Sequence, residues 1–285
     1  MRDQADLVAA ATTCFLGLDP WLAFECLHSA GIRNVEVPAY PARQSVEWRQ
    51  TTFSPETLGP AGTVRLRERL AAMKLTAVTV GAYASLLERD DLQPLLRRIE
   101  FAHQLGASFV IIDAAGREPD GPDEWQRVAN LGRFVGDYAQ SHGVRLAFEI
   151  HEGLTRSGAV ARRLLDAIDH DAVGVNYDTG NAIFYNDDVD PVADLATIID
   201  RVIHVHLKDT SGRRGEWAFG TLGTGHVDLP SIVRMLRERG FHGPYSLEVE
   251  GFAGEDVTRE TRIQRVRDSL AYLRNLGIQA WQNGT

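Results

Sequence analysis

The segment RVIHVHLKDT, residues 201–210, is an almost continuous run of apolar residues that carries His204, His206 and Lys208 at alternate positions. Alternate residues of a β-strand point to the same face, so these three side chains would project together. A nearly continuous apolar strand is typical of a sheet that is covered on both faces. Packing alone gives no reason to direct three polar groups into such an interior. The segment therefore predicts a buried strand with functional side chains.

Seven other segments read as strands, and helical patterns lie between them. These predicted strands are residues 12–17, 33–38, 76–81, 108–113, 144–150, 172–178 and 245–250. The helices have recognisable ends: Asp19 and Pro20 begin one that Gly31 ends, and Asp228 is expected to cap another. Eight strands, each followed by a helix, predict a closed (β/α)8 TIM barrel of the α/β class, one domain over residues 1–285.

An open, doubly wound α/β sheet is the alternative architecture. Such a sheet normally binds a nucleotide through a glycine-rich turn after its first strand. No such turn follows the first predicted strand, where the chain reads FLGLDP at residues 15–20. No linker-like or low-complexity stretch divides the chain. We therefore expect the barrel.

Composition narrows the class of protein. The chain has 30 basic and 39 acidic residues and a net charge of −9, which argues against a broad nucleic-acid surface. No apolar run approaches the length of a membrane helix, and the first 14 residues lack the features of a signal peptide. Cys14 and Cys26 are too few for a disulfide framework. We expect a cytoplasmic protein with no membrane or nucleic-acid partner.

Polar residues end four consecutive predicted strands, one strand–helix unit apart. This ligand set is Glu149, Asp178, His206 and Glu248. Active sites of such barrels lie at the C-terminal ends of the strands. Three carboxylates and an imidazole suit a divalent cation such as Mn²⁺, Mg²⁺, Co²⁺ or Zn²⁺, and without one the carboxylates would repel each other. His204, deeper in the strand, is better interpreted as a core group or as a group that contacts the metal ligands from behind.

Each of these residues also has a purely structural interpretation. A buried strand glutamate can pair with Arg or Lys, a strand histidine is often a satisfied core residue, and an Asp before Thr-Gly can form a turn. The joint pattern on four successive strand ends favours the metal site over four separate structural explanations.

Five motifs of the second half of the chain resemble the xylose-isomerase-like barrel superfamily, which includes sugar isomerases, epimerases, inosose dehydratases and endonuclease IV. They are FEIH (148–151), NYDTGN (176–181), HVHLKD (204–209), LGTGHVD (222–228) and GPYSLEVE (243–250). The resemblance implies that Glu149, Asp178, His206 and Glu248 hold one divalent metal ion, with Mn²⁺ expected first. Spacing from Gly243 favours Glu248 over Glu250 as the last ligand.

The resemblance also implies an activity on a small, unphosphorylated keto-sugar or cyclitol. A metal that holds a ketone oxygen and the adjacent hydroxyl lowers the pKa of the intervening C–H by stabilising an enediolate. Glu149 and Glu248 would flank the substrate, one removing the proton and the other returning it, which gives an isomerase or epimerase. Loss of a β-hydroxyl at the same site would give a dehydratase. Lys208 and His151 face this rim and are expected to donate to a substrate oxygen, or else to form salt bridges with Asp209 or Glu152.

Further residues are expected to contact substrate. Asn181 stands where ketohexose 3-epimerases of the family carry a histidine, and Thr155 stands where they carry a glutamate, so classical ketohexose epimerase activity is not implied. Asn181 can still bond a hydroxyl. Arg213 and Trp217, on the loop 211–223, are expected to reach over the substrate as a lid. Glu36, near the end of the second strand, is a candidate substrate contact or the partner of an arginine.

Two other functions fit the sequence less well. An endonuclease IV-like phosphodiesterase would need additional histidines on the third and fourth strands, and the predicted segments 76–81 and 108–113 contain none. A barrel that binds carbohydrate without turnover would be favoured by loss of a metal ligand, and all four are present. Barrels of this group are often dimers or tetramers, so the sequence is compatible with both a monomer and a homo-oligomer.

Overall fold

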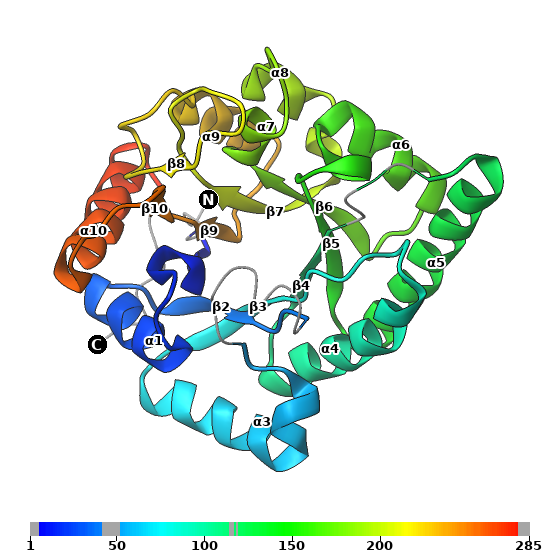
Figure 1. Ribbon diagram of the computed structural model, residues 1–285, viewed down its shortest axis with the longest axis horizontal. Helices are drawn as coiled ribbons and strands as arrows, with labels where there is room; N and C mark the ends of the chain where they lie inside the picture. Colours follow the sequence, from blue (N-terminus) through cyan, green and yellow to red (C-terminus); the bar gives the residue numbers. More distant parts are fainter. Residues whose placement is uncertain (1–5, 42–51, 114–116, 118, 279–285) are drawn as a thin grey trace.

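Eight parallel strands close into a barrel, and helices surround it (Figure 1). The structure is a computed structural model, and it describes residues 6–41, 52–113, 117 and 119–278. In barrel order the strands are β1 (Val8–Ala11), β2 (Asn34–Pro38), β3 (Thr76–Gly81), β4 (Phe109–Ile112), β5 (Arg145–Glu149), β6 (Val173–Asp178), β7 (Val202–Leu207) and β9 (Tyr245–Leu247). β1 pairs with both β2 and β9, which closes the barrel. The predicted (β/α)8 fold is confirmed.

Helices cover the outside of the barrel, except for one short helix whose Asn181 and Phe184 line the cavity described below. They are α1 (Pro20–Ala30), α3 (Pro55–Ala72), α4 (Leu92–Leu105), α5 (Pro122–Ser141), α6 (Gly158–Ile168), α7 (Asn181–Phe184), α8 (Pro191–Ala196), α9 (Leu229–Glu238) and α10 (Arg259–Asn275). The predicted helix ends are confirmed: Asp19 accepts a hydrogen bond from the Trp21 amide, and Gly31 ends α1 in the left-handed conformation. The Asp228 carboxylate caps α9 by accepting from the Ser231 amide.

The prediction for the first strand is wrong. Residues 12–17 do not form a strand: Thr12–Phe15 form a short 3-10 helix, η1, and β1 is the preceding Val8–Ala11. β1 consists of one valine and three alanines, and alanine has a low intrinsic preference for strands. Neighbours on both sides, β2 and β9, supply the pairing that its own sequence does not signal.

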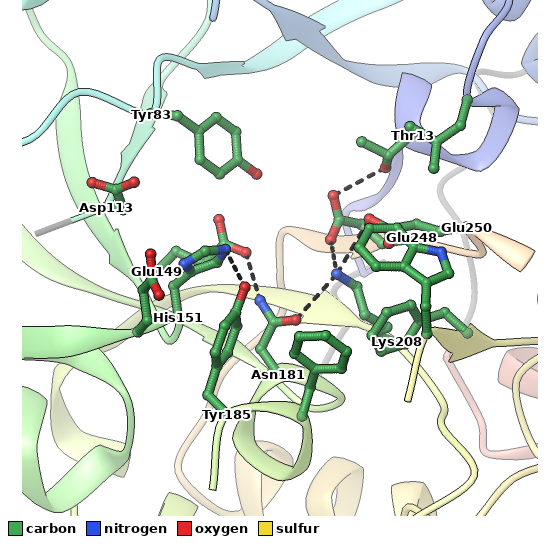
Figure 2. A pocket seen from close by; sticks show the side chains of 15 residues that line it. Thr13, Tyr83, Asp113, Glu149, His151, Asn181, Tyr185, Lys208, Glu248 and Glu250 are labelled. Carbon is green, nitrogen blue, oxygen red and sulfur yellow. Dashed lines mark hydrogen bonds and ion pairs between the residues drawn. The ribbon is translucent and has the colours of Figure 1, made fainter. Parts of the chain in front are cut away.

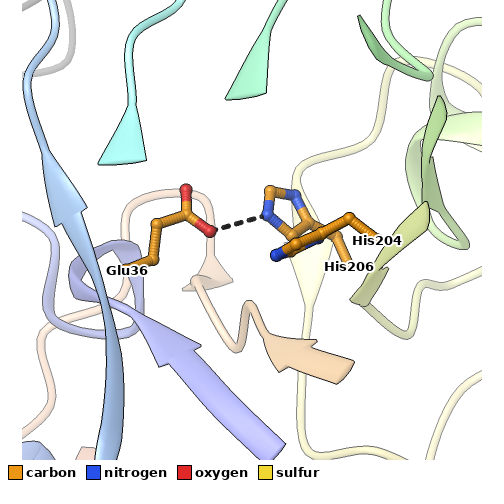
Figure 3. A group of neighbouring side chains, drawn as sticks. All are labelled: Glu36, His204 and His206. Carbon is orange, nitrogen blue, oxygen red and sulfur yellow. Dashed lines mark hydrogen bonds and ion pairs between the residues drawn. The ribbon is translucent and has the colours of Figure 1, made fainter. Parts of the chain in front are cut away.

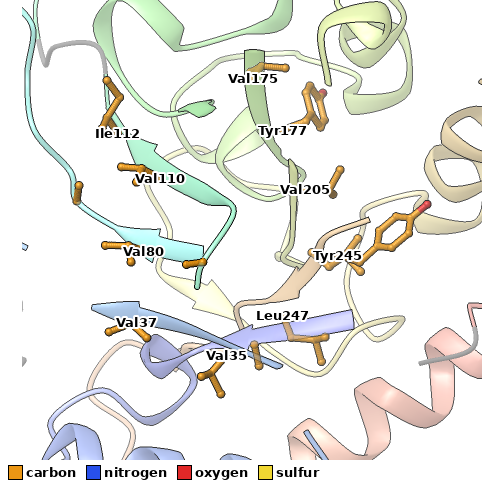
Figure 4. Close-up of a cluster of buried hydrophobic side chains, with 14 of the residues drawn as sticks. Val35, Val37, Val80, Val110, Ile112, Val175, Tyr177, Val205, Tyr245 and Leu247 are labelled. Atoms are coloured by element: carbon orange, nitrogen blue, oxygen red, sulfur yellow. The ribbon is translucent and has the colours of Figure 1, made fainter. Parts of the chain in front are cut away.

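Apolar strand residues pack outward against the helices. Figure 4 shows this layer, which includes Val35, Val80, Val110, Val175 and Val205, all fully buried. The other face of the same strands turns toward the barrel axis and is polar over half the barrel. The polar residues there are Glu36, Thr79, Asn176, His204, His206 and Ser246, each no more than 1% exposed.

Two β-bulges lie beside this polar interior. Val35 pairs with Ala77 whereas Glu36 pairs with Thr79, so β3 has one extra residue there. Val175 pairs with Val202 whereas Asn176 pairs with His204, so β7 has another. A bulge re-aims the side chains beside it.

Within the described residues, no helix combines the length and the apolar character needed to cross a bilayer.

Candidate functional site

A cavity of about 560 Å³ opens at the C-terminal end of the barrel (Figure 2). Its lining includes Thr13, Glu149, His151, Asn181, Tyr185, Lys208, Glu248 and Glu250. Figure 2 shows Glu149 and His151 on one side of the cavity and Glu248 and Glu250 on the other, with Asn181 between them. The predicted strand ends of the second half of the chain contribute Glu149, Lys208 and Glu248 to this lining, and Tyr83 and Asp113 follow strands of the first half.

The structure brings the predicted ligand set together. Glu149 ends β5, Asp178 ends β6, His206 lies near the end of β7, and Glu248 follows β9 directly. One oxygen or nitrogen atom of each lies within 4.8 Å of the corresponding atoms of the other three. All four side chains are at most 2% exposed.

The free atoms of this cluster fit a divalent cation. Asp178 Oδ1 accepts from the amides of Gly180 and Asn181 at 2.9 and 2.8 Å, which leaves Oδ2 directed at the cluster. Asp178 Oδ2, Glu149 Oε2 and His206 Nδ1 are buried and have no hydrogen-bond partner, and Asp178 Oδ2 has an ion-pair contact with Lys208 at 3.2 Å. Buried polar atoms are normally satisfied, so several unpartnered ligand atoms at one point indicate a missing partner. Carboxylate oxygens with one imidazole nitrogen are ligands that Mn²⁺, Mg²⁺ and Zn²⁺ accept.

The electrostatics of the cluster show the same need for positive charge. Burial raises the pKa of Glu149 to about 7. Burial opposes protonation of His206, but the carboxylates of Glu248, Glu36 and Glu149 raise its pKa well above the usual value. For Glu248 burial acts upward, yet the charges of His206 and Lys208 hold its pKa well below the usual range. Without a cation, protons on His206 and Glu149 therefore balance the carboxylates.

Lys208 is the cation of the pocket floor. Its Nζ lies 2.8 Å from Glu248 Oε2, 3.2 Å from Asp178 Oδ2 and 3.3 Å from Glu250 Oε1. The ammonium also lies 4.8 Å from the centroid of the Phe219 ring. The alternative pairing with Asp209 is not formed, because that carboxylate is occupied by backbone amides. Lys208 therefore faces the predicted rim.

His151 lines the pocket and pairs with a tyrosine. Its Nε2 lies 2.7 Å from the hydroxyl of Tyr185, which directly follows the short helix α7. Burial, helped by the nearby charge of Lys208, lowers the pKa of His151 to about 4, so the ring is neutral. His151 Nδ1 is buried without a hydrogen-bond partner. The partner of the ring in the described structure is therefore Tyr185, and not Glu152.

Asn181 connects the two sides of the floor. Its Nδ2 donates to Glu149 Oε1 and to the Ile150 carbonyl, both at 3.1 Å, and its Oδ1 accepts from Lys208 at 3.4 Å. The side chain lines the pocket, but its amide already holds Glu149 and Lys208 in place.

The loop 211–223 contributes an aromatic wall. Trp217 and Phe219 line the pocket beside Phe184, with ring centroids 5.2 to 6.2 Å apart. Arg213 lies outside this pocket: its side chain is 80% exposed and its nearest acid is Glu216 at 4.0 Å. The structure thus supports a pocket role for Trp217 and does not place Arg213 where it was predicted.

The same loop is anchored at two points. β8 (Ala218–Phe219) pairs with β10 (Gly251–Phe252), just after Glu250. The buried Asp209 carboxylate accepts four backbone N–H bonds, from the residues Thr210, Gly223, Gly225 and Val227 at 2.8 to 3.2 Å. These contacts anchor the loop on both sides of Trp217, and in this structure the loop forms one wall of the pocket; the predicted lid role stays a prediction.

Glu36 does not line the pocket. Its carboxylate lies inside the barrel, where Oε2 accepts from His206 Nε2 at 3.0 Å. The predicted arginine partner is therefore a histidine. His204 is a core group as expected, because it bonds Thr79 and Asn176.

Sequence reasoning missed several residues of the pocket. Thr13, on η1, donates to Glu248 Oε1 at 3.0 Å, and its position was hidden by the wrong strand prediction. Glu250 was set aside in favour of Glu248, yet its carboxylate lines the pocket and Oε2 has no partner. Tyr185 lies shortly after the motif NYDTGN. The sequence does not show where the chain runs after this motif, so Tyr185 could not be placed in the pocket.

Comparisons with known proteins agree with this architecture. A family model described as xylose isomerase-like TIM barrel matches residues 24–276. The chain is 25% identical to inosose dehydratase 2 of Bacillus cereus, with 53% of this chain and 56% of that protein covered. It is 28% identical to the rhizopine catabolism protein MocC of Rhizobium meliloti, with 72% and 73% covered. The match thus spans little more than half of the Bacillus protein.

Solved structures share the fold at low sequence identity. An L-ribulose 3-epimerase superposes with a TM-score of 0.72 at 18% identity, covering 96% of this chain and 95% of that one. A xylose isomerase-like TIM barrel protein from Mycobacterium smegmatis in complex with magnesium has a TM-score of 0.72 at 20% identity, covering 94% and 98%. At these identities the likeness concerns the fold alone.

Proposed function

The chain belongs to the xylose isomerase-like TIM barrel family, and from that premise we propose a divalent-metal-dependent isomerase or epimerase that moves a proton beside the carbonyl of a small keto-sugar or cyclitol. The observation that carries the proposal is the convergence of Glu149, Asp178, His206 and Glu248 at the C-terminal end of the barrel. Mn²⁺ is the ion we propose first, and Mg²⁺, Co²⁺ and Zn²⁺ share the required ligand chemistry.

The lining of the pocket supports a neutral, polyhydroxylated substrate. Among the described lining residues Lys208 is the only lysine or arginine, and its ammonium is already paired with carboxylates. Further carboxylates of Asp113, Glu152 and Glu250 face the cavity. A phosphate or carboxylate on the substrate would meet like charge there, which disfavours binding. The aromatic wall offers an apolar surface to the C–H face of a sugar ring.

Two carboxylates are placed to transfer the proton. A bound divalent cation would supply the positive charge that lowers the pKa of a C–H next to a carbonyl. Glu149 and Glu248 face each other across the floor, 3.5 and 3.3 Å from His206 Nδ1 (Figure 2). One removes the proton, and the other returns it to the opposite face or to the neighbouring carbon. Lys208 donates to a substrate oxygen.

Dehydration is the second candidate reaction. The Lys208 ammonium lies between Glu248 and Glu250, where it can protonate a departing hydroxyl after the adjacent C–H has been ionised. Asn181 replaces the histidine of the ketohexose 3-epimerases and cannot shuttle a proton. Curated relatives named inosose dehydratases support this alternative.

A deuterium-exchange screen tests the proposal and separates the two reactions. Purified protein, loaded with Mn²⁺ or treated with EDTA, is incubated in D₂O with a panel of ketopentoses, ketohexoses and inososes, and products are followed by NMR and mass spectrometry. Metal-dependent deuterium incorporation without loss of water would identify an isomerase or epimerase. Formation of a dione with loss of water would identify a dehydratase.

The controls are two carboxamide variants. Glu149→Gln removes a proposed proton-transfer group and should slow exchange about 10²- to 10⁴-fold. Asp200→Asn changes an exposed carboxylate that pairs with Arg162 outside the pocket and should keep it. Absence of both exchange and dehydration across the panel, in protein shown to contain metal, would contradict the proposal.

A further inference from the structure

A second group of ligand-type side chains lies deeper in the barrel. Glu36, His204 and His206 each offer one atom within 4.8 Å of the others (Figure 3). This group does not form a second metal site, because both nitrogens of His204 are already used. His204 Nδ1 lies 2.8 Å from Asn176 Oδ1, and Nε2 lies 3.0 Å from Thr79 Oγ1.

Glu36 contacts the ligand set through one atom only. Its Oε2 lies 3.0 Å from His206 Nε2, with Ser246 Oγ at 3.5 Å from the same oxygen. A carboxylate can only accept hydrogen bonds, so a neutral His206 ring in this contact carries its one proton on Nε2. The lone pair of Nδ1 is then available on the side that faces Glu149, Asp178 and Glu248.

We propose that Glu36 is a positioning residue that holds His206 in the Nε2–H tautomer, with Nδ1 as its metal-binding atom. This inference rests on the proposed function, since it assigns a role toward the proposed metal. Histidines that bind metals typically donate their other N–H to a carboxylate or carbonyl, and this contact fixes the ring and raises its basicity.

The backbone around Glu36 is built for this contact. The bulge in β3 lies where Glu36 pairs with Thr79, and the bulge in β7 lies just before the two histidines. Gly81 leaves space for the carboxylate: a Cβ there would lie 2.9 Å from Glu36 Oε1. It would also lie 3.0 Å and 3.1 Å from the rings of Tyr83 and Tyr40. The side chain of Glu36, which belongs to β2, is thus confined by residues of β3 and β7.

Metal affinity provides the first test. Glu36→Leu removes the acceptor at similar volume, and Glu36→Gln keeps an acceptor but removes the charge. Thr79→Val is the matched control, because it removes a buried hydrogen bond to His204 in the same interior. Mn²⁺ dissociation constants are measured by titration with EPR detection of free Mn²⁺, and folding is checked by circular dichroism.

We expect Glu36→Leu to weaken Mn²⁺ binding about 10- to 100-fold, the effect usual for loss of such a contact. Glu36→Gln should bind with intermediate affinity, and Thr79→Val should stay within about twofold of the unmodified protein, because the Thr79 hydroxyl bonds His204 and no member of the ligand set. A purely structural role for Glu36 would lower thermal stability while leaving the affinity of the folded protein unchanged.

The tautomer is read directly in the unmodified protein. Long-range ¹H–¹⁵N NMR of the Zn²⁺-loaded protein should show His206 protonated at Nε2 and not at Nδ1. Protonation at Nδ1, or equal Mn²⁺ affinity in Glu36→Leu and Thr79→Val, would overturn the inference while leaving the metal site intact. If Glu36→Leu does not fold, the inference is tested by the NMR result and by the Mn²⁺ affinity of Glu36→Gln. Failure of the unmodified protein to bind metal would instead remove the proposed function, and this inference with it.

Discussion

His206 faces acids through both of its ring nitrogens. Nε2 contacts Glu36 below, and Nδ1 lies 3.3 to 3.7 Å from oxygens of Glu149, Asp178 and Glu248 above. Four nearby carboxylates favour the protonated, charged form of the imidazole. A metal cation bound to one ring nitrogen would take the place of the proton there. The local chemistry of this residue therefore links the buried interior of the barrel to the pocket.

The proposed proton-transfer pair gives the first prediction. Glu149→Gln and Glu248→Gln should each lower kcat about 10²- to 10⁴-fold, the usual contribution of a general acid or base. The rate of deuterium exchange from solvent into substrate is the direct measurement. Both variants are also assayed for bound metal, so that loss of the ion is distinguished from loss of proton transfer. Full activity in both variants would show that the pair is wrongly assigned.

Trp217 gives a prediction about binding. Trp217→Ala removes part of the aromatic wall and should raise KM about 3- to 10-fold with little change in kcat, from a stacking energy of about 1 kcal/mol. Trp217→Phe keeps an aromatic face and serves as the control. Equal KM values in all three proteins would show that the wall does not contact substrate.

For single residues, the sequence identified those whose place in the fold follows from strand position. Glu149, Asp178 and His206 lie at or near the ends of strands with clear patterns, so their convergence was predictable. Contacts across the barrel were not predictable, because no local pattern shows that Glu36 on β2 reaches β7. Bulges add to this difficulty, since they change the alternation that strand reasoning depends on.

The loop after β7 is organised by one buried carboxylate. Asp209 accepts four backbone N–H bonds, and β8 pairs with β10 beyond it. The length of the loop 211–223 and its glycines suggested a lid, because glycine-flanked loops near a site often move. Anchoring at both points holds Trp217 against the pocket.

Asp209→Ala tests this anchoring. The variant leaves buried N–H groups unpaired, so the free energy of unfolding should fall by about 1–3 kcal/mol in urea denaturation. KM should also rise, because the wall that carries Trp217 loosens. Asp228→Ala, which removes only the cap of α9, should cost about 1 kcal/mol and leave KM unchanged. Equal KM values in the two variants would contradict the anchoring role.

Elements with strong patterns were predicted well, and one without such a pattern was not. β3 occupies residues 76–81 as predicted, and α1 begins and ends at the predicted cap and glycine. β1 is formed by alanines whose strand conformation comes from pairing with β2 and β9. Tertiary pairing of this kind overrides local propensity, which a single sequence does not display.

The barrel as a whole concentrates negative charge at one end. Eight parallel strands point their C-terminal ends to the same rim, so carboxylates that are far apart in sequence become neighbours. The pKa of Glu149 is raised to about 7 and that of Glu250 to about 8, in both cases chiefly by burial. The metal-free protein therefore keeps protons at neutral pH that the unfolded chain releases.

Stability of the metal-free protein should fall as pH rises from 6 to 9. Glu149 and Glu250 have raised folded-state pKa values, so the native state binds more protons than the unfolded chain in this range. His206, whose pKa is also raised, acts with the same sign. Melting temperatures measured in EDTA should therefore decrease with pH.

The metal-loaded protein should behave differently. A bound cation replaces these protons, so Mn²⁺ binding should release protons and weaken as pH falls below about 7. Calorimetry in buffers of different ionisation enthalpy measures the release. Glu149→Gln, which cannot titrate, should show a flatter dependence of melting temperature on pH in EDTA. A melting temperature that rises with pH in EDTA would contradict this account.

The central claim is that one divalent cation is held by the ends of the last four barrel strands. Anomalous diffraction at the manganese edge, from crystals grown with Mn²⁺, tests it directly. We predict one strong peak within bonding distance of Glu149, Asp178, His206 Nδ1 and Glu248. No peak at these residues, or a peak bound elsewhere with the four side chains turned apart, would contradict the claim.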